Sequence, residues 1–295
     1  MVSRVESRPG NMPNGATRLL AIVGDPIAQV RAPAFWSAAF GARGIDLLCI
    51  PIHVPPADLL PALRGLQVMR NVDGIIVTVP HKTAACRCVD RLSARAAAIG
   101  AINMMRREAD DSWSGDIFDG VGFVDGLAAA GIALDQRRVL LVGAGGAGTA
   151  IGFALAHAGV REIRVFDTDG DRAVSLRDRL SHGAGPPISC VDAPDPSDVD
   201  LAINATPLGL RPDDRLPLDV DRLTPATIVA DVIMKPRQTR LLRAAAERGC
   251  RTHDGVHMMD HQAPHAADFF RFPGHDWSVE TVRRLVENEQ SPGGR

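Results

Sequence analysis

The chain has 295 residues, of which 45% are hydrophobic and 23% charged, and its formal net charge is −2 at pH 7. This composition suffices for the cores of two domains of ordinary size. Acidic and basic residues are interspersed and only 4% of residues are aromatic, which excludes the basic, aromatic-rich groove of a nucleic-acid-binding protein. No apolar run is long enough to cross a membrane, and the first 16 residues lack a signal-peptide core, so we expect a cytoplasmic protein.

The first part of the chain alternates short apolar runs with segments of helical periodicity. The apolar runs predict buried strands at residues 19–23, 47–53 and 74–79. The periodic segments predict helices at residues 33–42, 57–69 and 82–92. A further helix at residues 120–130, ending near Gly131, would link this part to the next. The alternation is typical of βαβ units and a mostly parallel sheet.

A second set of βαβ units follows this linking helix. Its strands are expected within RRVLLV, EIRVFD, LAIN and TIVADVI, with helices between them. The sequence therefore predicts an α/β protein with two lobes.

The stretch VLLVGAGGAG places Gly143, Gly145 and Gly148 in G-x-G-x-x-G spacing, directly after a strand and at the start of a helix. Glycine lets the backbone turn tightly and approach a pyrophosphate, whose charge is stabilised at the helix N-terminus. Asp167 ends the next strand, 24 residues after Gly143, near the place where an acid faces an adenosine ribose. Together these features predict a dinucleotide site.

Asp167 also bears on the choice of cofactor. A carboxylate accepts hydrogen bonds from the free ribose hydroxyls of NAD and repels the 2′-phosphate of NADP. Arg172 lies close in the sequence and could hold that phosphate, although Asp169 and Asp171 add opposing charge. We expect NAD, with NADP as the open alternative.

Two polar segments of the first lobe are candidates for catalysis. VTVPHK places Thr78 and Lys82 around the end of a buried strand, and GDIFDG places Asp119 at the start of the linking helix. GAIN places Asn103 between them. If both segments face a cleft between the lobes, Lys82 and Asp119 supply a proton donor and acceptor for hydride transfer. A solvated surface ion pair is the alternative.

Metal-binding signals are weak. His257, His261 and His265 lie four residues apart beside Asp260, but Pro264 is expected to interrupt their helix, and zinc would need a fourth converging ligand. The five cysteines are scattered and form no C-x-x-C pair, which predicts free thiols. We expect no metal.

The chain resembles the shikimate and quinate dehydrogenase family over residues 19–285. The matching segments are GDPI, VTVPHK, GAIN, GDIFDG, VGAGGAG, INATPLG and DGVHMMDHQA. The resemblance implies NAD(P)-dependent interconversion of a ring hydroxyl and a ketone on a small cyclic polyol, by a monomer or a homodimer. It also implies a substrate-binding α/β domain at 17–119, a Rossmann-type domain at 120–255, and C-terminal helices at 256–290 that pack back on the first domain.

The resemblance further implies roles for individual residues. The lysine and aspartate that flank the reacting hydroxyl in the family match Lys82 and Asp119. The asparagine and glutamine that hold substrate hydroxyls match Asn103 and Gln262, and the strand threonine matches Thr78. The implied cofactor-binding residues are Gly143, Gly145, Gly146, Ala147, Gly148, Asp167, Arg172, Ala205, Thr206, Gly255 and Met258.

One loop departs from the family pattern. In the family, G-x-P-I is followed by His-Ser-x-Ser-Pro, and the two serine hydroxyls hold the substrate carboxylate. Here the corresponding residues are Gln29, Val30, Arg31, Ala32 and Pro33, so both hydroxyls are missing.

Two more donors to the same carboxylate are missing. Ile76 replaces an asparagine and Met234 replaces a tyrosine. Each charged partner left unmet costs about 1 to 3 kcal/mol. Ordinary shikimate would therefore bind badly unless another residue compensates, for which Arg31 and His81 are the candidates. The loop is expected to hold the far end of a cyclic polyol whose acid group is absent, moved or differently bound.

Three functions remain open on this basis: a shikimate or quinate dehydrogenase with a rebuilt carboxylate site, a dehydrogenase of another cyclic polyol, and a non-catalytic nucleotide-binding regulator. Retention of both Lys82 and Asp119 favours an enzyme. A short-chain dehydrogenase is excluded because its Tyr-x-x-x-Lys pair requires a tyrosine, and the chain has none.

Overall fold

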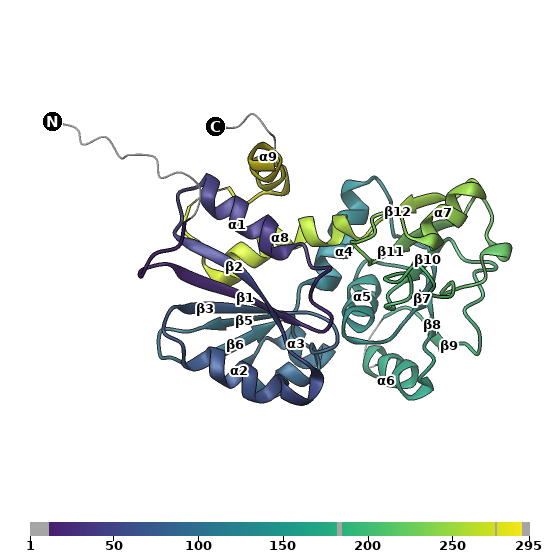
Figure 1. The fold of residues 1–295 in the computed structure, drawn as a ribbon. Helices are drawn as coiled ribbons and strands as arrows, with labels where there is room; N and C mark the ends of the chain where they lie inside the picture. The colour runs from purple at the N-terminus through teal and green to yellow at the C-terminus, as the bar shows by residue number, and fades with distance from the viewer. Residues whose placement is uncertain (1–11, 182–184, 275, 291–295) are drawn as a thin grey trace.

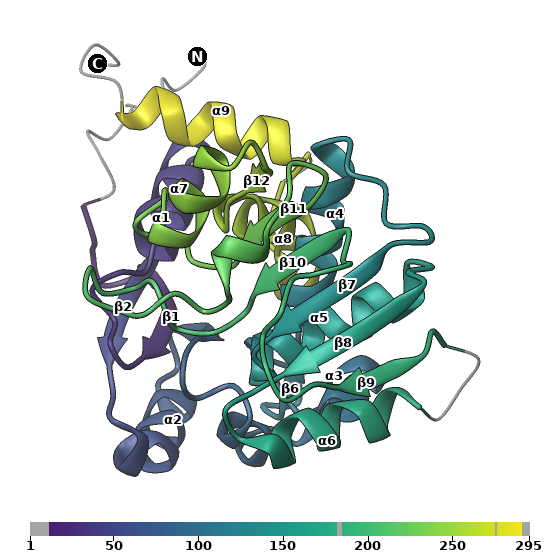
Figure 2. The same cartoon turned by 90° about the vertical axis from the view of Figure 1, so that its right-hand side faces the viewer.

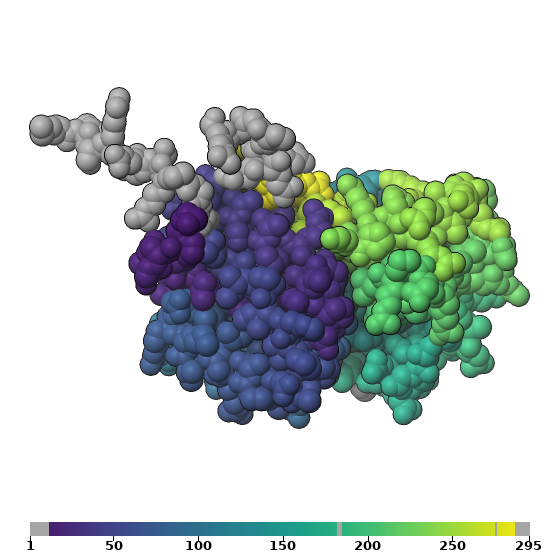
Figure 3. Space-filling model, in the orientation of Figure 1, coloured from purple at the N-terminus to yellow at the C-terminus, as the bar shows by residue number. Residues whose placement is uncertain are grey.

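The computed structural model describes residues 12–181, 185–274 and 276–290. Within these ranges the chain forms two six-stranded sheets, which lie side by side as two lobes (Figure 1). On the face drawn in Figure 3, the first lobe borders the second directly. No helix in the described ranges combines the length and apolar content needed to cross a bilayer.

The sheet of the first lobe is mixed, in the order β2-β1-β3-β5-β6-β4. Its strands are β1 (Arg18–Gly24), β2 (Leu47–His53), β3 (Val72–Val77), β4 (Arg91–Leu92), β5 (Met104–Arg107) and β6 (Trp113–Asp116). The three strands predicted in this lobe are present as β1, β2 and β3, and β1 pairs in parallel with both of the others. Strand β5 pairs antiparallel with β3 and β6, which the βαβ interpretation missed.

The helix predicted at 82–92 is wrong. This segment forms a 3₁₀ turn, η2 (Ala84–Cys88), and then strand β4. The regular helix starts later, as α3 (Ala94–Ile99), because the Ser93 side chain accepts a hydrogen bond from the backbone N–H of Ala96 and so caps it. The other helices of this lobe are α1 (Ala32–Ala42), η1 (Pro56–Asp58) and α2 (Leu59–Val68).

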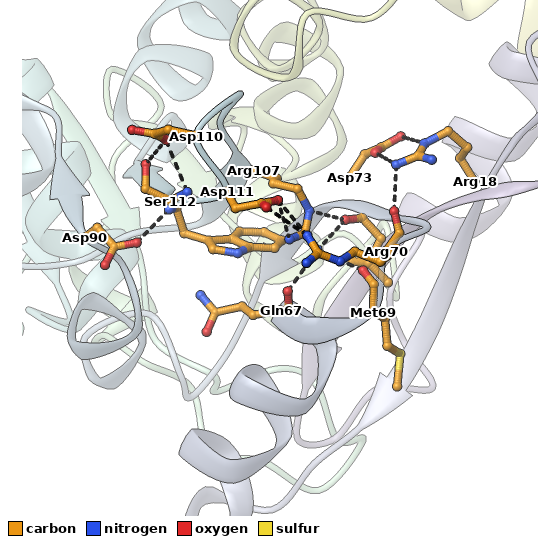
Figure 4. Close-up of polar contacts among 12 residues, drawn as sticks. Arg18, Gln67, Met69, Arg70, Asp73, Asp90, Arg107, Asp110, Asp111 and Ser112 are labelled. Atoms are coloured by element: carbon orange, nitrogen blue, oxygen red, sulfur yellow. Dashed lines mark hydrogen bonds and ion pairs between the residues drawn. The ribbon is translucent and has the colours of Figure 1, made fainter.

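Arg107, the last residue of β5, binds the stretch of backbone that connects α2 to β3 (Figure 4). Its guanidinium donates hydrogen bonds to the carbonyls of Gln67, Met69 and Val72, at 2.9, 2.8 and 3.2 Å. It also lies over the Trp113 ring, 4.8 Å from the centroid. The arginine satisfies carbonyls that the end of α2 leaves without helical partners, which fixes α2 against the start of β3.

The sheet of the second lobe is entirely parallel, in the order β12-β11-β10-β7-β8-β9, and Figure 2 shows its strands with α5 and α6 beside them. This is the Rossmann-type arrangement expected from the sequence. Its strands are β7 (Arg138–Val142), β8 (Glu162–Phe166), β9 (Ile188–Cys190), β10 (Leu201–Asn204), β11 (Ile228–Asp231) and β12 (Arg251–His253). Its helices are α5 (Gly146–His157), α6 (Gly170–Leu180), η3 (Val220–Arg222) and α7 (Arg240–Glu247).

The linking helix is present as α4 (Asp119–Ala129), and three glycines bring it unusually close to its neighbours. A Cβ atom at Gly120 would lie 2.1 Å from the Ala150 carbonyl oxygen of α5. A Cβ at Gly122 would lie 2.5 Å from the Met258 carbonyl oxygen, and one at Gly126 would lie 3.1 Å from the His257 Cβ. Ala150 belongs to α5, and His257 and Met258 belong to α8. Helix α4 therefore packs closely against two helices, α5 on one side and α8 on the other.

Helix α8 (Val256–Phe270) continues through Pro264, so the expected interruption there is wrong. Buried residues on both sides of the proline, including Gln262, Ala263 and Ala266, hold the helix in place by tertiary packing. Together with α9 (Val279–Gln290), α8 contributes to an apolar cluster that contains Phe35, Trp36 and Phe40 of α1. The domain limits expected from the sequence, 17–119, 120–255 and 256–290, remain predictions.

Candidate active site

A cleft of about 1330 Å³ lies between the two lobes. Its walls come from the carboxyl ends of the strands of both sheets, where open α/β sheets bind ligands. Most residues predicted for the site line this cleft: Arg31, Thr78, Lys82, Asn103, Asp119, Gly143, Gly145, Gly146, Ala147, Asp167, Arg172, Ala205, Thr206, Met258 and Gln262.

Two predicted cofactor residues, Gly148 and Gly255, do not line it. A Cβ at Gly148 would lie 1.9 Å from the Gly143 carbonyl oxygen, and one at Gly255 would lie 2.3 Å from the Val232 carbonyl oxygen. Both glycines therefore allow close backbone packing beside the cleft, and their contact with the cofactor remains a prediction.

Lys82 and Asp119 meet in the cleft, although they are 37 positions apart in the chain. Their side chains form an ion pair of 2.5 Å between Nζ and Oδ2, and only 14% and 4% of the two side chains are exposed. Asp119 is the first residue of α4, where the helix dipole favours a carboxylate. The low exposure excludes the solvated surface pair considered above.

Two amide side chains complete the cluster. The Asn103 amide oxygen accepts a hydrogen bond from the Phe118 backbone N–H at 3.0 Å, which fixes the orientation of the amide. Its NH₂ group then donates to Asp119 Oδ1 at 3.1 Å and to Gln262 Oε1 at 2.9 Å. Gln262 Nε2 in turn faces Asp119 Oδ1 at 3.3 Å. The cluster brings the residue before β5, the start of α4 and the middle of α8 together around one carboxylate.

This arrangement can handle a proton at a substrate oxygen. An ammonium and a carboxylate held in contact supply a donor and an acceptor within one site, and the neighbouring amides offer further hydrogen bonds to hydroxyl groups. Burial of both charges is tolerated because each has the other as partner and the carboxylate also has amide donors.

The glycine-rich turn lies directly beside this cluster. Gly143 has φ +102°, a conformation that favours glycine, and a Cβ there would lie 2.9 Å from the Ala205 carbonyl carbon. A Cβ at Gly146 would lie 3.0 Å from the Lys82 Cβ, so the start of α5 contacts the lysine. At Gly145 a Cβ would meet no atom within 4 Å. Open space at a helix N-terminus suits a pyrophosphate, so these residues fit a dinucleotide.

Asp167 lies at the adenosine end of the expected dinucleotide site. Its Oδ2 accepts a hydrogen bond from the Ala144 N–H at 2.7 Å, and its Oδ1 accepts one from the Asp169 N–H at 2.9 Å. Each oxygen keeps a lone pair for a further donor. Arg172 forms an ion pair of 3.1 Å with Asp169, and both side chains are at least half exposed.

Several cations in the cleft were missed by the sequence reasoning: Arg87, Arg179, Arg215 and Lys235. Arg179, in the last turn of α6, donates from Nη1 to the Ile99 carbonyl at 2.7 Å and so joins the two lobes. No sequence signal distinguishes these residues from ordinary surface cations, because each depends on where its helix or loop lies in space.

Apolar residues also line the cleft. Val30, Ala32, Ile76 and Met234, at the positions where the family resemblance predicts missing carboxylate donors, all line it together with Arg31. Within the described ranges, the Arg31 side chain has no hydrogen-bonding or ionic partner.

His81, the other candidate for compensation, does not line the cleft. It is 1% exposed, and its Nε2 lies 2.7 Å from the Val54 carbonyl oxygen. Its ring is therefore directed into the first lobe, so the suggestion that it takes a substrate acid group is wrong.

The histidines of α8 have other partners. His265 pairs with Asp125 at 2.9 Å, and His261 Nδ1 lies 2.8 Å from the His257 carbonyl oxygen. In the described parts of the chain, no three histidine, cysteine or acidic side chains gather closely enough to hold a metal ion.

Known proteins resemble this chain over nearly its whole length. Residues 22–105 match the shikimate dehydrogenase substrate binding domain. The shikimate dehydrogenase (NADP(+)) of Rubrobacter xylanophilus is 35% identical over 281 residues, which cover 94% of this chain and 98% of that protein.

Solved structures agree. The quinate dehydrogenase of Corynebacterium glutamicum in complex with NAD is 32% identical, with a TM-score of 0.78 over 92% of this chain and 99% of that one. The 5-ketofructose reductase of Gluconobacter sp. strain CHM43 is 29% identical, with a TM-score of 0.76 over 92% and 98%. The fold, the paired lysine and aspartate and these similarities lead to one conclusion: the chain belongs to the shikimate and quinate dehydrogenase family of NAD(P)-dependent oxidoreductases.

Proposed function

We propose that the protein interconverts a secondary hydroxyl and a ketone on an uncharged, polyhydroxylated substrate, with NAD as its preferred cofactor. The observation that carries this proposal is a contrast inside one cleft. Lys82, Asp119, Asn103 and Gln262 form a complete polar cluster at the reacting end, while the four positions that should hold a carboxylate are apolar.

The polar cluster supports a proton-transfer role at the reacting oxygen. In oxidation, the Lys82 and Asp119 pair takes the hydroxyl proton as the carbon loses hydride, and in reduction it returns that proton. Asn103 and Gln262 orient neighbouring substrate hydroxyls by hydrogen bonds. A bound nicotinamide supplies the hydride acceptor or donor. The residues that would hold the dinucleotide are the turn at 143–147, Asp167 and the backbone at Ala205 and Thr206.

The apolar end favours an uncharged substrate. A carboxylate placed against Val30, Ala32, Ile76 and Met234 loses its hydration and gains no hydrogen bond from these side chains. Arg31, without a partner of its own, supplies N–H donors that can hold a hydroxyl oxygen. The similarity to a 5-ketofructose reductase supports this substrate class, because its named substrate is an uncharged ketose.

Steady-state kinetics test this proposal. With NAD or NADH, kcat/KM is measured for shikimate, quinate, uncharged cyclitols and uncharged ketoses including 5-ketofructose. We expect an uncharged compound to exceed shikimate by about 100-fold or more, the factor that two missing donors to a charged group imply. Efficient turnover of shikimate would contradict the uncharged-substrate proposal. Dinucleotide binding without turnover of any compound would favour a regulator.

The NAD preference rests on Asp167. Its carboxylate has lone pairs available to ribose hydroxyls, and the nearby Arg172 is engaged by Asp169. Asp167→Asn removes the charge that opposes a 2′-phosphate, so the ratio of kcat/KM for NADP over NAD should rise about tenfold, equivalent to about 1.4 kcal/mol. Asp178→Asn, in the same lobe and outside the cleft, is the matched control. An unchanged ratio in Asp167→Asn would contradict this assignment.

A further inference from the structure

A fully buried polar cluster lies behind the cleft, at the carboxyl ends of β10 and β11. Asn204 and Asp231 are the last residues of these strands and pair in register. Both are 0% exposed, as is the nearby Thr239. Asp231 Oδ1 accepts hydrogen bonds from Asn204 Nδ2 at 3.1 Å and from the Ile233 N–H at 3.0 Å. Its Oδ2 accepts one from the Thr239 hydroxyl at 2.8 Å.

Asn204 extends the cluster into the loop after β10. Its Nδ2 also donates to the Leu208 carbonyl at 3.0 Å. Its Oδ1 accepts from the Thr206 N–H at 3.1 Å and from the Thr206 hydroxyl at 2.7 Å. The Thr206 hydroxyl oxygen accepts from the Leu208 N–H at 3.1 Å. Through this one amide, Asp231 is connected to the whole of loop 205–208.

Burial raises the pKa of Asp231 to about 6, and no cation contributes to its environment. A buried carboxylate whose partners are all neutral donors keeps a desolvation cost that a paired cation would reduce. This cost is explained if the carboxylate fixes the position of backbone segments that apolar packing alone would not hold in one conformation. The carboxylate contacts loop 232–234 directly, through the Ile233 N–H, and reaches loop 205–208 through Asn204; residues of both loops line the cleft.

The position of these loops identifies which part of the ligand they face. Strand β7 is central, with β8 on one side and β10 and β11 on the other. Asp167, at the expected adenosine end, follows β8. A dinucleotide that crosses the glycine turn therefore places its nicotinamide on the β10 and β11 side. The turn also packs on this loop, since a Cβ at Gly143 would lie 2.9 Å from the Thr206 Cγ2.

We propose that Asp231 is a positioning residue for the nicotinamide half of the cofactor: through Asn204 and the Ile233 N–H, its carboxylate holds loops 205–208 and 232–234 at the distance that half requires. This inference rests on the proposed dinucleotide function and adds residues that do not themselves touch the ligand.

Binding measurements on the purified 295-residue protein distinguish the contributions of the two halves of the dinucleotide to its affinity. Calorimetry gives Kd for NADH, which occupies both halves, and for ADP-ribose, which lacks the nicotinamide. Asp231→Ala should weaken NADH about tenfold or more, because a loop displaced by about 1 Å loses contacts of this size, and should change ADP-ribose less than about twofold.

Two matched variants accompany it. Asp231→Asn keeps an oxygen for Asn204 Nδ2 and the Ile233 N–H, so it should restore NADH affinity to within about threefold of the wild type. Thr239→Ala removes the third contact and the N-cap of α7, where Thr239 accepts from the Leu242 N–H. It should lower the melting temperature and leave NADH affinity within about twofold.

The outcomes are decisive. Equal weakening of NADH and ADP-ribose by Asp231→Ala, or an unchanged NADH affinity, would overturn the proposal. If Asp231→Ala does not fold, Asn204→Ser, which breaks the link between Asp231 and loop 205–208 at a residue that does not line the cleft, should still weaken NADH selectively, and its failure to do so is equally decisive. A wild-type protein that binds neither ligand would instead refute the dinucleotide function itself.

Discussion

The two ends of the substrate region differ in kind. At one end, Asn103 and Gln262 are hydrogen-bonded to each other and to Asp119, and Lys82 pairs with the same carboxylate, so Asp119 is the common partner of the other three side chains. At the other end, Val30, Ala32, Ile76 and Met234 present apolar side chains to the cleft, and the first three share one apolar cluster. The comparison teaches that mutually bonded polar side chains constrain one another, whereas an apolar side chain in a packed cluster can be exchanged for another without leaving a buried polar partner unpaired.

The largest expected effect comes from removing a charged side chain of the Lys82, Asp119, Asn103 and Gln262 cluster. Lys82→Ala removes the ammonium paired with Asp119, and kcat/KM should fall by about 10²- to 10⁴-fold, the usual contribution of a proton-transfer group. The dissociation constant of NADH should remain within about threefold, because the chemical step and dinucleotide binding use different contacts. Activity close to that of the wild type would contradict the role assigned to this end.

A smaller effect is expected from introducing hydrogen-bond donors at the four apolar positions of the cleft. The combination Val30→Ser, Ala32→Ser, Ile76→Asn and Met234→Tyr introduces four potential donors. If two of them reach a carboxylate, kcat/KM for shikimate should rise about 100-fold, since each hydrogen bond to a charged group contributes about 1.5 kcal/mol.

Adding Lys82→Ala to this combination is the control. The gain should disappear, because the new donors improve recognition and supply no proton. No gain from the four-residue variant would show that a carboxylate does not bind at this end of the cleft.

The smallest effect concerns Arg31, a cation that lies in the chain between Val30 and Ala32 and lines the cleft with them. Arg31→Met keeps the length of the side chain and removes its donors, so kcat/KM for the best uncharged substrate should fall about tenfold. If the loss were instead confined to acidic substrates, Arg31 would be the residue that binds a substrate carboxylate. The protein would then still recognise a charged substrate, with an arginine in place of the usual hydroxyl donors.

The sequence predicts the second lobe better than the first, for a physical reason. Parallel strands buried on both faces appear as continuous apolar runs, so β7, β8, β10 and β11 are visible in the sequence. Strands β5 and β6 are short and antiparallel, and their neighbours β4 and α3 are shorter than the windows in which periodicity can be measured. The prediction of a helix at 82–92, in this part of the first lobe, was wrong for that reason.

The candidate site divides in the same way. Residues in motifs, such as Lys82 and Gly143, could be placed in the cleft because their chemistry depends on a local turn. Arg179 and the inward direction of His81 depend on how distant elements pack, so one sequence does not reveal them. The Asp231 cluster could not be predicted because Asn204 and Asp231 end two strands whose register the sequence does not specify.

The glycines of α4 have a consequence for the geometry of catalysis. Where Gly120 meets α5 and Gly122 meets α8, α4 contributes no side chain to the contact, and backbone carbonyl oxygens of the neighbouring helices approach it directly. Asp119 immediately precedes Gly120, and Gln262 belongs to α8. The spacing between the Asp119 carboxylate, the Gln262 amide and helix α5 is thus set largely by backbone contacts of α4. Side-chain changes elsewhere in the cleft can alter which molecule enters while this spacing stays constant.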